Sequence, residues 1–387
     1  MINQFGFVSE ETFAEKMDTQ NVLLAGLLES RSGSIKPTSW TNVQALVRAG
    51  LHKKVFSIGD QLVCQKGSSN ITWDVIGIDH DTPADSQFTH SMTLQMHECL
   101  PNMVYDVPEA LYYAENGLEA GTYNFTIQSG YETSYGGGKT YQFTLENNVP
   151  VGGQLTFGWT NNTLAVNAKI TSYASATSAT QIEQVSVAEG NSGTSLGTTD
   201  GTTTNLNHIH KVRFGNNYYS ESAVRQFINS DGAIGNAWTY KNKFDRPPAW
   251  AADTAGFLND LDSDFLSVLG ISNKVTVIST VNGGGSVTIN DKFFLLSKSE
   301  VFAGNEVTLV DEGSPYPYYS DYSDLSNAGI NADSNRIKYR NNIAQGWWLR
   351  SPINANASHA RTVGATGNIS PSFSSNSYGI SPACNVI

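Results

Sequence analysis

The fold is decided by two stretches near the C-terminus, Gly346-Trp347-Trp348-Leu349-Arg350-Ser351-Pro352 and Gly379-Ile380-Ser381-Pro382-Ala383-Cys384-Asn385-Val386-Ile387. Between them, residues 353–378 are mostly Ser, Asn, Ala, Thr and Gly, with one Arg, one His and no carboxylate. A segment with so few large apolar side chains cannot build a core of its own. We therefore expect a surface segment that its two flanks hold in place.

Composition limits the possible classes of protein. The chain has 387 residues, of which 39% are hydrophobic and 15% charged, as is usual for a folded protein. Its net charge is −12 and it contains no run of Lys and Arg, so we expect no nucleic-acid partner. The N-terminus does not have the pattern of a signal peptide, and no stretch approaches the roughly 18 apolar residues of a membrane span. These features predict a protein made in the cytoplasm, with no signal peptide and no membrane insertion.

Metal and cofactor motifs are weak. The cysteines are Cys64, Cys99 and Cys384, an odd and sparse set that does not suggest disulfides, and we expect buried thiols. His208 and His210 would lie on one face of a strand, but no further ligand follows at the spacing of a metal site. We predict no metal and no cofactor.

Two other motifs imitate functional loops. Residues 138–140 read Gly-Lys-Thr, like the end of a phosphate-binding loop, but the first Gly of that motif and its helix are missing, so we interpret them as a turn. Residues 79–81 read Asp-His-Asp before Thr-Pro, which we interpret as local turn chemistry. No nucleophile elbow occurs and no His lies beside a candidate nucleophile, so we predict no enzymatic activity.

Three aspartates imitate the start of a calcium loop, at positions Asp260, Asp262 and Asp264. Phe265 stands where such a loop requires Gly, and the bidentate Glu is also missing. Apolar side chains recur through residues 257–269 at the period of an amphipathic helix. We therefore assign the aspartates to the polar side of that helix.

The N-terminal region predicts helices. Five residues recur at spacings of four, three, four and three: Phe13, Met17, Gln20, Leu24 and Leu27. This pattern is typical of a short coiled coil. The alternative is one amphipathic helix packed on its own domain. Residues 40–47 predict a second short helix. We assign residues 1–50 to an N-terminal helical segment for attachment or oligomerisation.

The rest of the chain predicts a mixture of strands and helices. Residues 55–60 and 71–78 have the pattern of two strands, and residues 222–229 that of a short helix. A hairpin is expected at residues 275–289, around Asn282-Gly283-Gly284.

Alternating apolar residues between 121 and 189 predict a small antiparallel β-sandwich, and a Gly/Ser/Thr-rich linker follows it. We thus expect an α+β fold. Its discontinuous domain comprises residues 51–118 and 207–387, and an all-β sandwich with its linker is inserted at residues 119–206.

The paired tryptophans have two interpretations. Trp347 and Trp348 could form a platform on which a sugar stacks, or both could be structural. Adjacent strand residues point to opposite faces, so we expect at most one of them in the core and the other in a second interface. Arg350 is expected to be a buried anchor that hydrogen-bonds loop carbonyls or pairs with an acid such as Asp324.

Several motifs together carry a family resemblance. They are Trp347-Trp348-Leu349-Arg350-Ser351-Pro352, then Ala360, Val363 and Gly367, then Gly379-Ile380-x-Pro382-Ala383-Cys384, with Trp40-x-x-Val43-Gln44-x-x-Val47-Arg48-Ala49-Gly50, Phe56-Ser57-Ile58-Gly59-Asp60, Asp291-Lys292-Phe293-Phe294-Leu295-Leu296-Ser297 and Asn335-Arg336-Ile337-Lys338-Tyr339-Arg340 upstream. They resemble the C-type-lectin-fold domain of variable proteins that retroelements diversify in gut bacteria and their phages. The resemblance covers most of residues 40–118 and 207–387.

The resemblance implies a variable region at residues 353–378. Adenine-directed mutagenesis of Asn codons cannot produce Lys, Gln, Glu, Met or Trp, and none of these types occurs there. By resemblance, the binding face comprises Ile353, Asn354, Asn356, Ser358, His359, Thr362, Ala365, Thr366, Asn368, Ser370, Ser372, Phe373, Ser374, Asn376 and Tyr378. The scaffold beneath it comprises Trp347, Trp348, Leu349, Arg350, Pro352, Val363, Gly379 and Ile380. We expect the binding-face positions to be exposed, since small polar residues with a few aromatics suit a recognition surface.

The resemblance also implies a function. We expect a receptor-binding adhesin of a phage or prophage, located on the virion and attached to tail or other virion proteins through its N-terminus, as a homotrimer. Its partner would be a bacterial surface protein or glycan. One alternative is a non-variable structural or decoration protein of a phage tail or capsid. The other is an oxidase like the formylglycine-generating enzyme, which requires reactive cysteines in the C-terminal part, where Cys384 stands alone.

Overall fold

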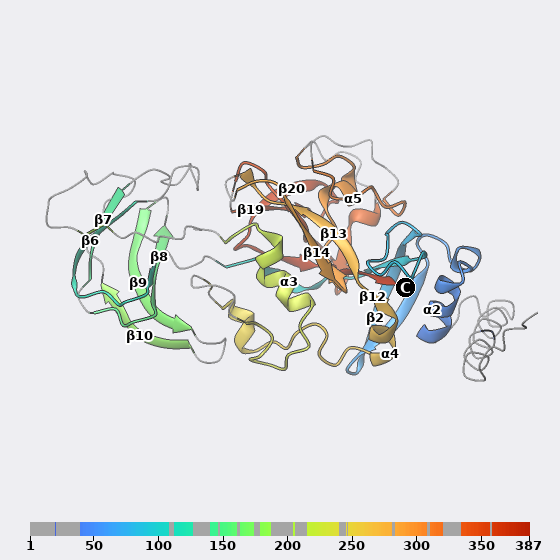
Figure 1. The fold of residues 1–387 in the computed structure, drawn as a ribbon, viewed down its shortest axis with the longest axis horizontal. Coiled ribbons are helices and arrows are strands. Elements are labelled where there is room, and N and C mark those ends of the chain that lie inside the picture. Colours follow the sequence, from blue (N-terminus) through green and yellow to red (C-terminus); the bar gives the residue numbers. More distant parts are fainter. Residues whose placement is uncertain are drawn as a thin grey trace, which may run out of the picture.

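The computed structural model describes residues 20, 39–107, 112–126, 140–145, 148–160, 163–173, 179–186, 204–205, 215–239, 245, 247–280, 283–307, 310–319, 334–356 and 358–387. Several predictions fall outside them: the coiled coil apart from Gln20, the His208/His210 pair, Gly138, Lys139 and Asp324. The described fold is mixed α+β, with many strands and few helices (Figure 1), which confirms the predicted class at that level. No helix in the described part of the chain is long and apolar enough to cross a membrane.

The largest sheet joins distant parts of the chain. Its strand order is β1-β2-β3-β22-β12, and β15 also pairs with β22. Its strands are β1 (Gln61–Lys66), β2 (Ser69–Ile78), β3 (Met92–Met96), β12 (Leu269–Gly270), β15 (Phe293–Phe294) and β22 (Ala383–Val386). The final strand β22 thus lies inside the sheet, antiparallel to β3 on one side and to β12 and β15 on the other. Residues before and after the predicted insertion therefore share one sheet.

A second sheet carries most of the predicted binding face. Its order is β20-β19-β18-β21-β4, with β4 (Leu100–Val104), β18 (Trp347–Pro352), β19 (His359–Val363), β20 (Ile369–Phe373) and β21 (Ser377–Ile380). Two hairpins accompany the sheets: β13 (Ser272–Val277) with β14 (Ser286–Asp291), and β16 (Lys338–Arg340) with β17 (Ile343–Gln345). The β13–β14 pairing confirms the hairpin predicted around residues 282–284.

The helices in the described ranges are short. The α-helices are α2 (Trp40–Arg48), α3 (Ala223–Ile228), α4 (Ser263–Val268) and α5 (Lys298–Phe302), and the 3-10 helices are η1 (His52–Lys54), η3 (Tyr219–Glu221), η4 (Ala249–Ala252) and η6 (Ser334–Arg336). The predictions of α2 and α3 are confirmed.

Helix α2 belongs to the main core. It begins at Trp40, and Ser39 is its N-cap, whose side chain accepts a hydrogen bond from the Asn42 amide. The helix buries an apolar stripe that includes Leu46. The Trp40 and Phe265 ring centroids are 4.5 Å apart, which places α2 against α4. Although α2 lies within the range assigned to attachment, it packs with the domain predicted to begin at residue 51.

The predicted insertion contains strands in two sheets. One has the order β10-β9-β8-β5 and the other β11-β6-β7. The strands are β5 (Tyr112–Ala114), β6 (Gly121–Thr126), β7 (Thr140–Leu145), β8 (Gly153–Thr160), β9 (Thr163–Tyr173), β10 (Ala179–Ser186) and β11 (Thr204–Asn205). Figure 1 shows the curved strands β8–β10 at the left and the two larger sheets at the right. Strand β5 precedes residue 119, so the chain joins these sheets earlier than predicted.

Two local predictions are wrong. Residues 55–60 form turns instead of a strand, because Gly59 has a φ of 88° and the Asp60 side chain accepts a hydrogen bond from the Ser57 amide. The helix predicted from residue 257 begins only at Ser263, since Asp262 is its N-cap and Asp260 has a φ of 58°. The calcium-like aspartates therefore serve the turn and the cap before the helix.

The packing of α2 gives a stability prediction. Leu46 is 0% exposed, so Leu46→Ala should lower the free energy of unfolding by about 2–5 kcal/mol in denaturant titrations of the whole chain. Thr41→Ala, at an exposed position of the same helix, is the control and should change it by less than about 0.5 kcal/mol. Equal, small effects of both substitutions would show that α2 is not part of the core.

Candidate functional site

Strand β18 is buried along its whole length, and both tryptophans contribute to that burial. Trp347 and Trp348 are each 0% exposed. The indole of Trp347 donates to the carbonyl of Arg336 at 3.0 Å, and that of Trp348 donates to the carbonyl of Met103 at 2.9 Å. The expectation that at most one of them lies in the core is wrong, because packed elements cover both sides of this strand. Neither ring is open for sugar stacking.

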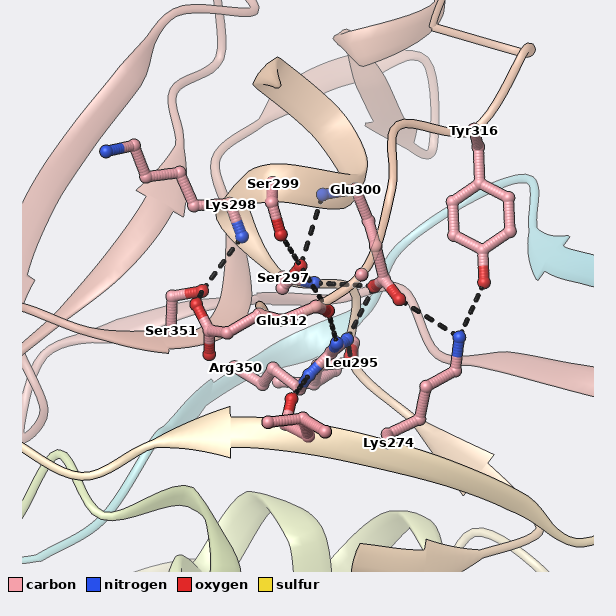
Figure 2. Close-up of polar contacts among 12 residues, drawn as sticks. Lys274, Leu295, Ser297, Lys298, Ser299, Glu300, Glu312, Tyr316, Arg350 and Ser351 are labelled. Carbon is pink, nitrogen blue, oxygen red and sulfur yellow. Dashed lines mark hydrogen bonds and ion pairs between the residues drawn. The ribbon is translucent and has the colours of Figure 1, made fainter. Parts of the chain in front are cut away.

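Arg350 is the buried anchor that the sequence predicted. Its Nε donates to the Val275 carbonyl at 3.1 Å, and one terminal nitrogen donates to the Leu295 carbonyl at 2.9 Å. That nitrogen also contacts the Glu300 carboxylate at 2.5 Å, and the other donates to the Glu312 carbonyl. The acid partner is thus Glu300 (Figure 2).

Lys274 extends this ion pair into a network. Its Nζ lies 3.0 Å from Glu300, 2.6 Å from Asp81 and 2.8 Å from the Tyr316 hydroxyl. The Asp81 carboxylate also accepts hydrogen bonds from Thr93, Tyr316 and Asn385. We call the five charged residues the buried ion network: Asp81, Lys274, Glu300, Glu312 and Arg350.

The side chains of this network are at most 10% exposed. Burial by itself raises the pKa of Glu300, but Arg350 and Lys274 outweigh it and the pKa lies below its usual value. Burial raises the pKa of Glu312, whose carboxylate accepts from the Ser351 hydroxyl at 2.5 Å. The charges of these groups are balanced by partners inside the protein. The network can therefore hold strands together, but it does not form a site that is open to solvent.

Asp81 corrects a sequence interpretation. The sequence Asp79-His80-Asp81 predicts local turn chemistry, and Asp79 does adopt a φ of 50°. The side chain of Asp81, however, is only 10% exposed and pairs with a lysine from β13. The spacing of the residues contains no signal for this contact, since Lys274 lies almost two hundred positions further along the chain.

The fifteen predicted binding-face residues differ in exposure. Ala365, Thr366 and Asn376 are exposed. The half-buried ones are Ile353, Asn354, Asn356, His359, Asn368, Ser370, Phe373 and Tyr378. Four are buried, so the expectation that they are exposed is wrong: Ser358, Thr362, Ser372 and Ser374.

Strand alternation explains two of the buried positions. In the β19–β20 pair, His359 lies opposite Phe373 and Arg361 opposite Pro371, while Ala360 lies opposite Ser372. Successive strand residues point to opposite faces of a sheet. The side chains of His359, Phe373, Arg361 and Pro371 therefore share the outward face, and those of Thr362 and Ser372 share the inward face. The inward face is buried. The alternation of inward and outward positions in residues 359–363 predicts a buried Thr362, whereas the family resemblance assigns it to the binding face.

Ser358 and Ser374 are buried because backbone contacts hold them. The Ser374 amide donates to the Ser358 carbonyl at 2.7 Å, and the Ser374 carbonyl accepts from the amides of Tyr105 and Asp106. The Ser358 hydroxyl donates to the Asn356 side chain at 2.8 Å. These serines connect the hairpin to the segment that follows β4.

A residue that sequence reasoning missed secures the first loop of the face. The side-chain amide of Asn217 donates to the carbonyls of Ile353, Asn356 and His359 at 3.3, 2.5 and 2.8 Å. The Ser279 hydroxyl donates to the Asn354 carbonyl at 2.6 Å. Both contacts are distant in sequence, so no local pattern indicates them.

The outward face of the hairpin is chemically mixed. The His359 and Phe373 ring centroids are 4.1 Å apart. Beside them, Arg361 forms a two-point pair with Glu306, at 2.8 and 2.9 Å. Among the strands that the structure describes, β20 is at the edge of its sheet, and Pro371 within it has no N–H to offer a further strand. This surface therefore favours recognition through side chains.

Other candidate sites lie elsewhere. Cys64, Cys99 and Cys384 are free and buried, as expected. In the described part of the chain, no group of three or more His, Cys, Asp or Glu side chains is placed to hold a metal ion. Cavities of about 400 and 480 Å³ lie beside α3 and beside α2, and no residue of the predicted binding face lines either one.

The contrast between two arginines gives a stability prediction. Arg350→Met removes a buried charge from Glu300 and should lower the free energy of unfolding by about 3–5 kcal/mol. Arg361→Met breaks a similar pair whose arginine side chain is 17% exposed, and should cost about 1 kcal/mol or less. Chemical denaturation measures both. Equal costs would contradict the anchoring role of Arg350.

The burial of four predicted face positions can also be tested. Ser374→Tyr should destabilise the protein by about 1–3 kcal/mol or more through overpacking, since Ser374 lies against Gly215. Asn376→Tyr, two residues away and exposed, should change stability by less than about 0.5 kcal/mol. Melting temperatures compare the two variants, and tolerance of Tyr at both positions would refute the assignment of Ser374 to the interior.

Comparison with known families matches residues 183–387, just over half of the chain, to a family described as "Domain of unknown function (DUF6273)". The matched part contains both C-terminal motif stretches and the hairpin β19–β20, but not β1, β2 or β3, with which β22 completes the large sheet. No curated protein and no solved structure matches the chain.

Proposed function

The chain belongs to the DUF6273 family, and we propose that it is a recognition protein whose outward β19–β20 surface and adjoining loops bind a partner on bacterial cells. The partner is a surface protein or a glycan. The recognition surface is the exposed and half-buried part of the predicted binding face without Ser370, which lies opposite Thr362 on the inward face of the hairpin. It is defined by Ile353, Asn354, Asn356, His359, Ala365, Thr366, Asn368, Phe373, Asn376 and Tyr378.

The observation that carries this proposal is the separation of scaffold from surface within one short segment. The eight scaffold residues predicted from the sequence are all buried, and β18 provides five of them. The hairpin attached to β18 presents small polar groups with the His359–Phe373 ring pair. Rigid aromatics with adaptable Ser and Asn side chains are the composition of known recognition surfaces. Such a surface can change its contacts while the core stays the same.

The finer proposals rest on the family resemblance. By that resemblance the domain has a C-type-lectin-like fold, its variable region is diversified by a retroelement, and the protein is a homotrimeric phage or prophage adhesin. The part of residues 1–50 that precedes α2 would attach it to tail or other virion proteins. The buried ion network fits this proposal, because it provides a scaffold on which surface residues can vary.

The state of the cysteines favours binding over the oxidase alternative. Burial raises the pKa of both Cys64 and Cys99 to about 12, and it raises the pKa of Cys384 well above its ordinary value. A thiol held protonated in this way is a poor nucleophile. An oxidase of the formylglycine-generating kind needs reactive cysteines, so these three fit structural roles better.

The test is binding of the labelled full chain to a panel of intact gut bacteria, measured by flow cytometry. A variant with Ala at His359, Thr366, Phe373 and Asn376 should lose binding, and its melting temperature should stay within about 2 °C of wild type because none of the four is in the core. The control carries Ala at Ile234 and Ile343, which are 63% and 65% exposed outside the recognition surface, and should bind like wild type.

Two results would contradict the proposal. Unchanged binding by the four-alanine variant would move recognition to another part of the chain, such as the inserted sheets. Absence of binding by the wild-type protein across the panel would favour a structural or decoration protein of a phage tail or capsid.

A further inference from the structure

The distribution of charge sets the recognition surface apart from the rest of the chain. The protein has 35 Asp and Glu residues and a net charge of −12. Residues 334–387 contain none of these carboxylates, but they do contain cationic side chains, at Arg336, Lys338, Arg340, Arg350 and Arg361. Arg336, Lys338 and Arg350 are buried, so Arg340 and Arg361 are the two of these cations that reach the surface. A negatively charged ligand would be repelled by most of the protein and least near such side chains.

A net positive charge lies beside the aromatic pair. Glu306 is held between Arg361, at 2.8 Å, and Lys298, whose Nζ lies 3.4 Å from the same carboxylate oxygen. Two cations and one anion leave a charge of about +1 here. The pair with Glu306 uses Nε and one terminal nitrogen of Arg361, so the other terminal nitrogen has no hydrogen-bond partner among the described residues. We call Lys298, Glu306 and Arg361 the cationic patch.

His359, beside the cationic patch, adds a hydrogen-bonding group for a sugar. Burial lowers the pKa of His359, so its ring is neutral near pH 7. The Ser358 hydroxyl lies 3.2 Å from Nδ1, which leaves Nε2 to exchange a hydrogen bond with a ligand hydroxyl. The Phe373 ring lies against His359, with the ring centroids 4.1 Å apart, and so holds the imidazole in place. His359 and Arg361 are two residues apart on one strand, so their side chains share a face.

We propose that this surface binds a saccharide that bears a negative charge, as a carboxylate or a phosphate. A sugar hydroxyl hydrogen-bonds to His359, and the charged group pairs with Arg361 and Lys298. This inference rests on the proposed function, because it names the ligand class of the same surface. It adds three residues that were not among the predicted binding face: Lys298, Glu306 and Arg361.

The test uses two substitutions with opposite expected signs. Arg361→Gln removes one cation and should weaken binding about three- to fivefold per site. Glu306→Gln removes the anion beneath the cations and should strengthen binding by a similar factor. Both substitutions break the same ion pair, so a merely structural role would change binding in the same direction in both variants.

The probes are a polyuronate and a phosphorylated dextran, with a neutral dextran of similar length as control, each immobilised and titrated with the full chain. Wild type should bind one or both charged polymers and not neutral dextran, with affinity falling as salt rises. The two charged polymers distinguish a carboxylate from a phosphate ligand. Arg340→Gln changes the net charge equally on a different hairpin and should have no effect.

Three outcomes would overturn this inference: no binding to either charged polymer, equal binding to neutral dextran, or Arg361→Gln and Glu306→Gln acting in the same direction. The whole-cell assay keeps this result separate from the proposed function. Cells that bind wild type but not the four-alanine variant would still support recognition by this surface. If protease treatment of those cells abolished binding and glycan oxidation did not, the partner would be a protein and the saccharide assignment would fail.

Discussion

The buried ion pair between Arg350 and Glu300 is the contact on which the C-terminal half depends. Removing two charges from water is costly, and their attraction compensates only when the remaining donors and acceptors are also paired. Here the guanidinium reaches carbonyls of β13, of the segment after β15 and of Glu312, while Glu300 also contacts Lys274. One side chain thereby fixes the position of β18 against elements that come from three separate parts of the chain.

The position of β18 determines what the surface can do. Strand β18 pairs with β19 on one side and β21 on the other, so the hairpin β19–β20 extends outward from a strand that cannot shift. Asn217 holds the first loop of the face through three backbone carbonyls, whatever side chains that loop carries. Because these supports are buried or use the backbone, most of the outward side chains are not needed for folding. A recognition surface requires this independence.

Some of this arrangement could be predicted from the sequence. The α+β class, helices α2 and α3, the β13–β14 hairpin and the burial of Arg350 follow from period, turn residues and composition. The contacts that fix the site could not be predicted, since Glu300, Asp81 and Asn217 are distant in sequence from the residues they hold. Burial of Thr362 and Ser372 followed from strand alternation, but a list of positions taken from a family resemblance does not distinguish the two faces of a hairpin. Both tryptophans are buried because the tertiary structure covers both sides of β18.

The measurement that tests the central claim most directly is sequencing of the coding locus across many members of one bacterial or phage population. A diversified recognition surface on a constant scaffold predicts nucleotide differences that concentrate at the codons of the recognition surface, such as those of Thr366, Phe373 and Asn376. The codons of Trp347, Arg350 and Asn217 should remain unchanged. Differences spread evenly over the locus, or frequent replacement of Arg350, would contradict the separation of scaffold from surface.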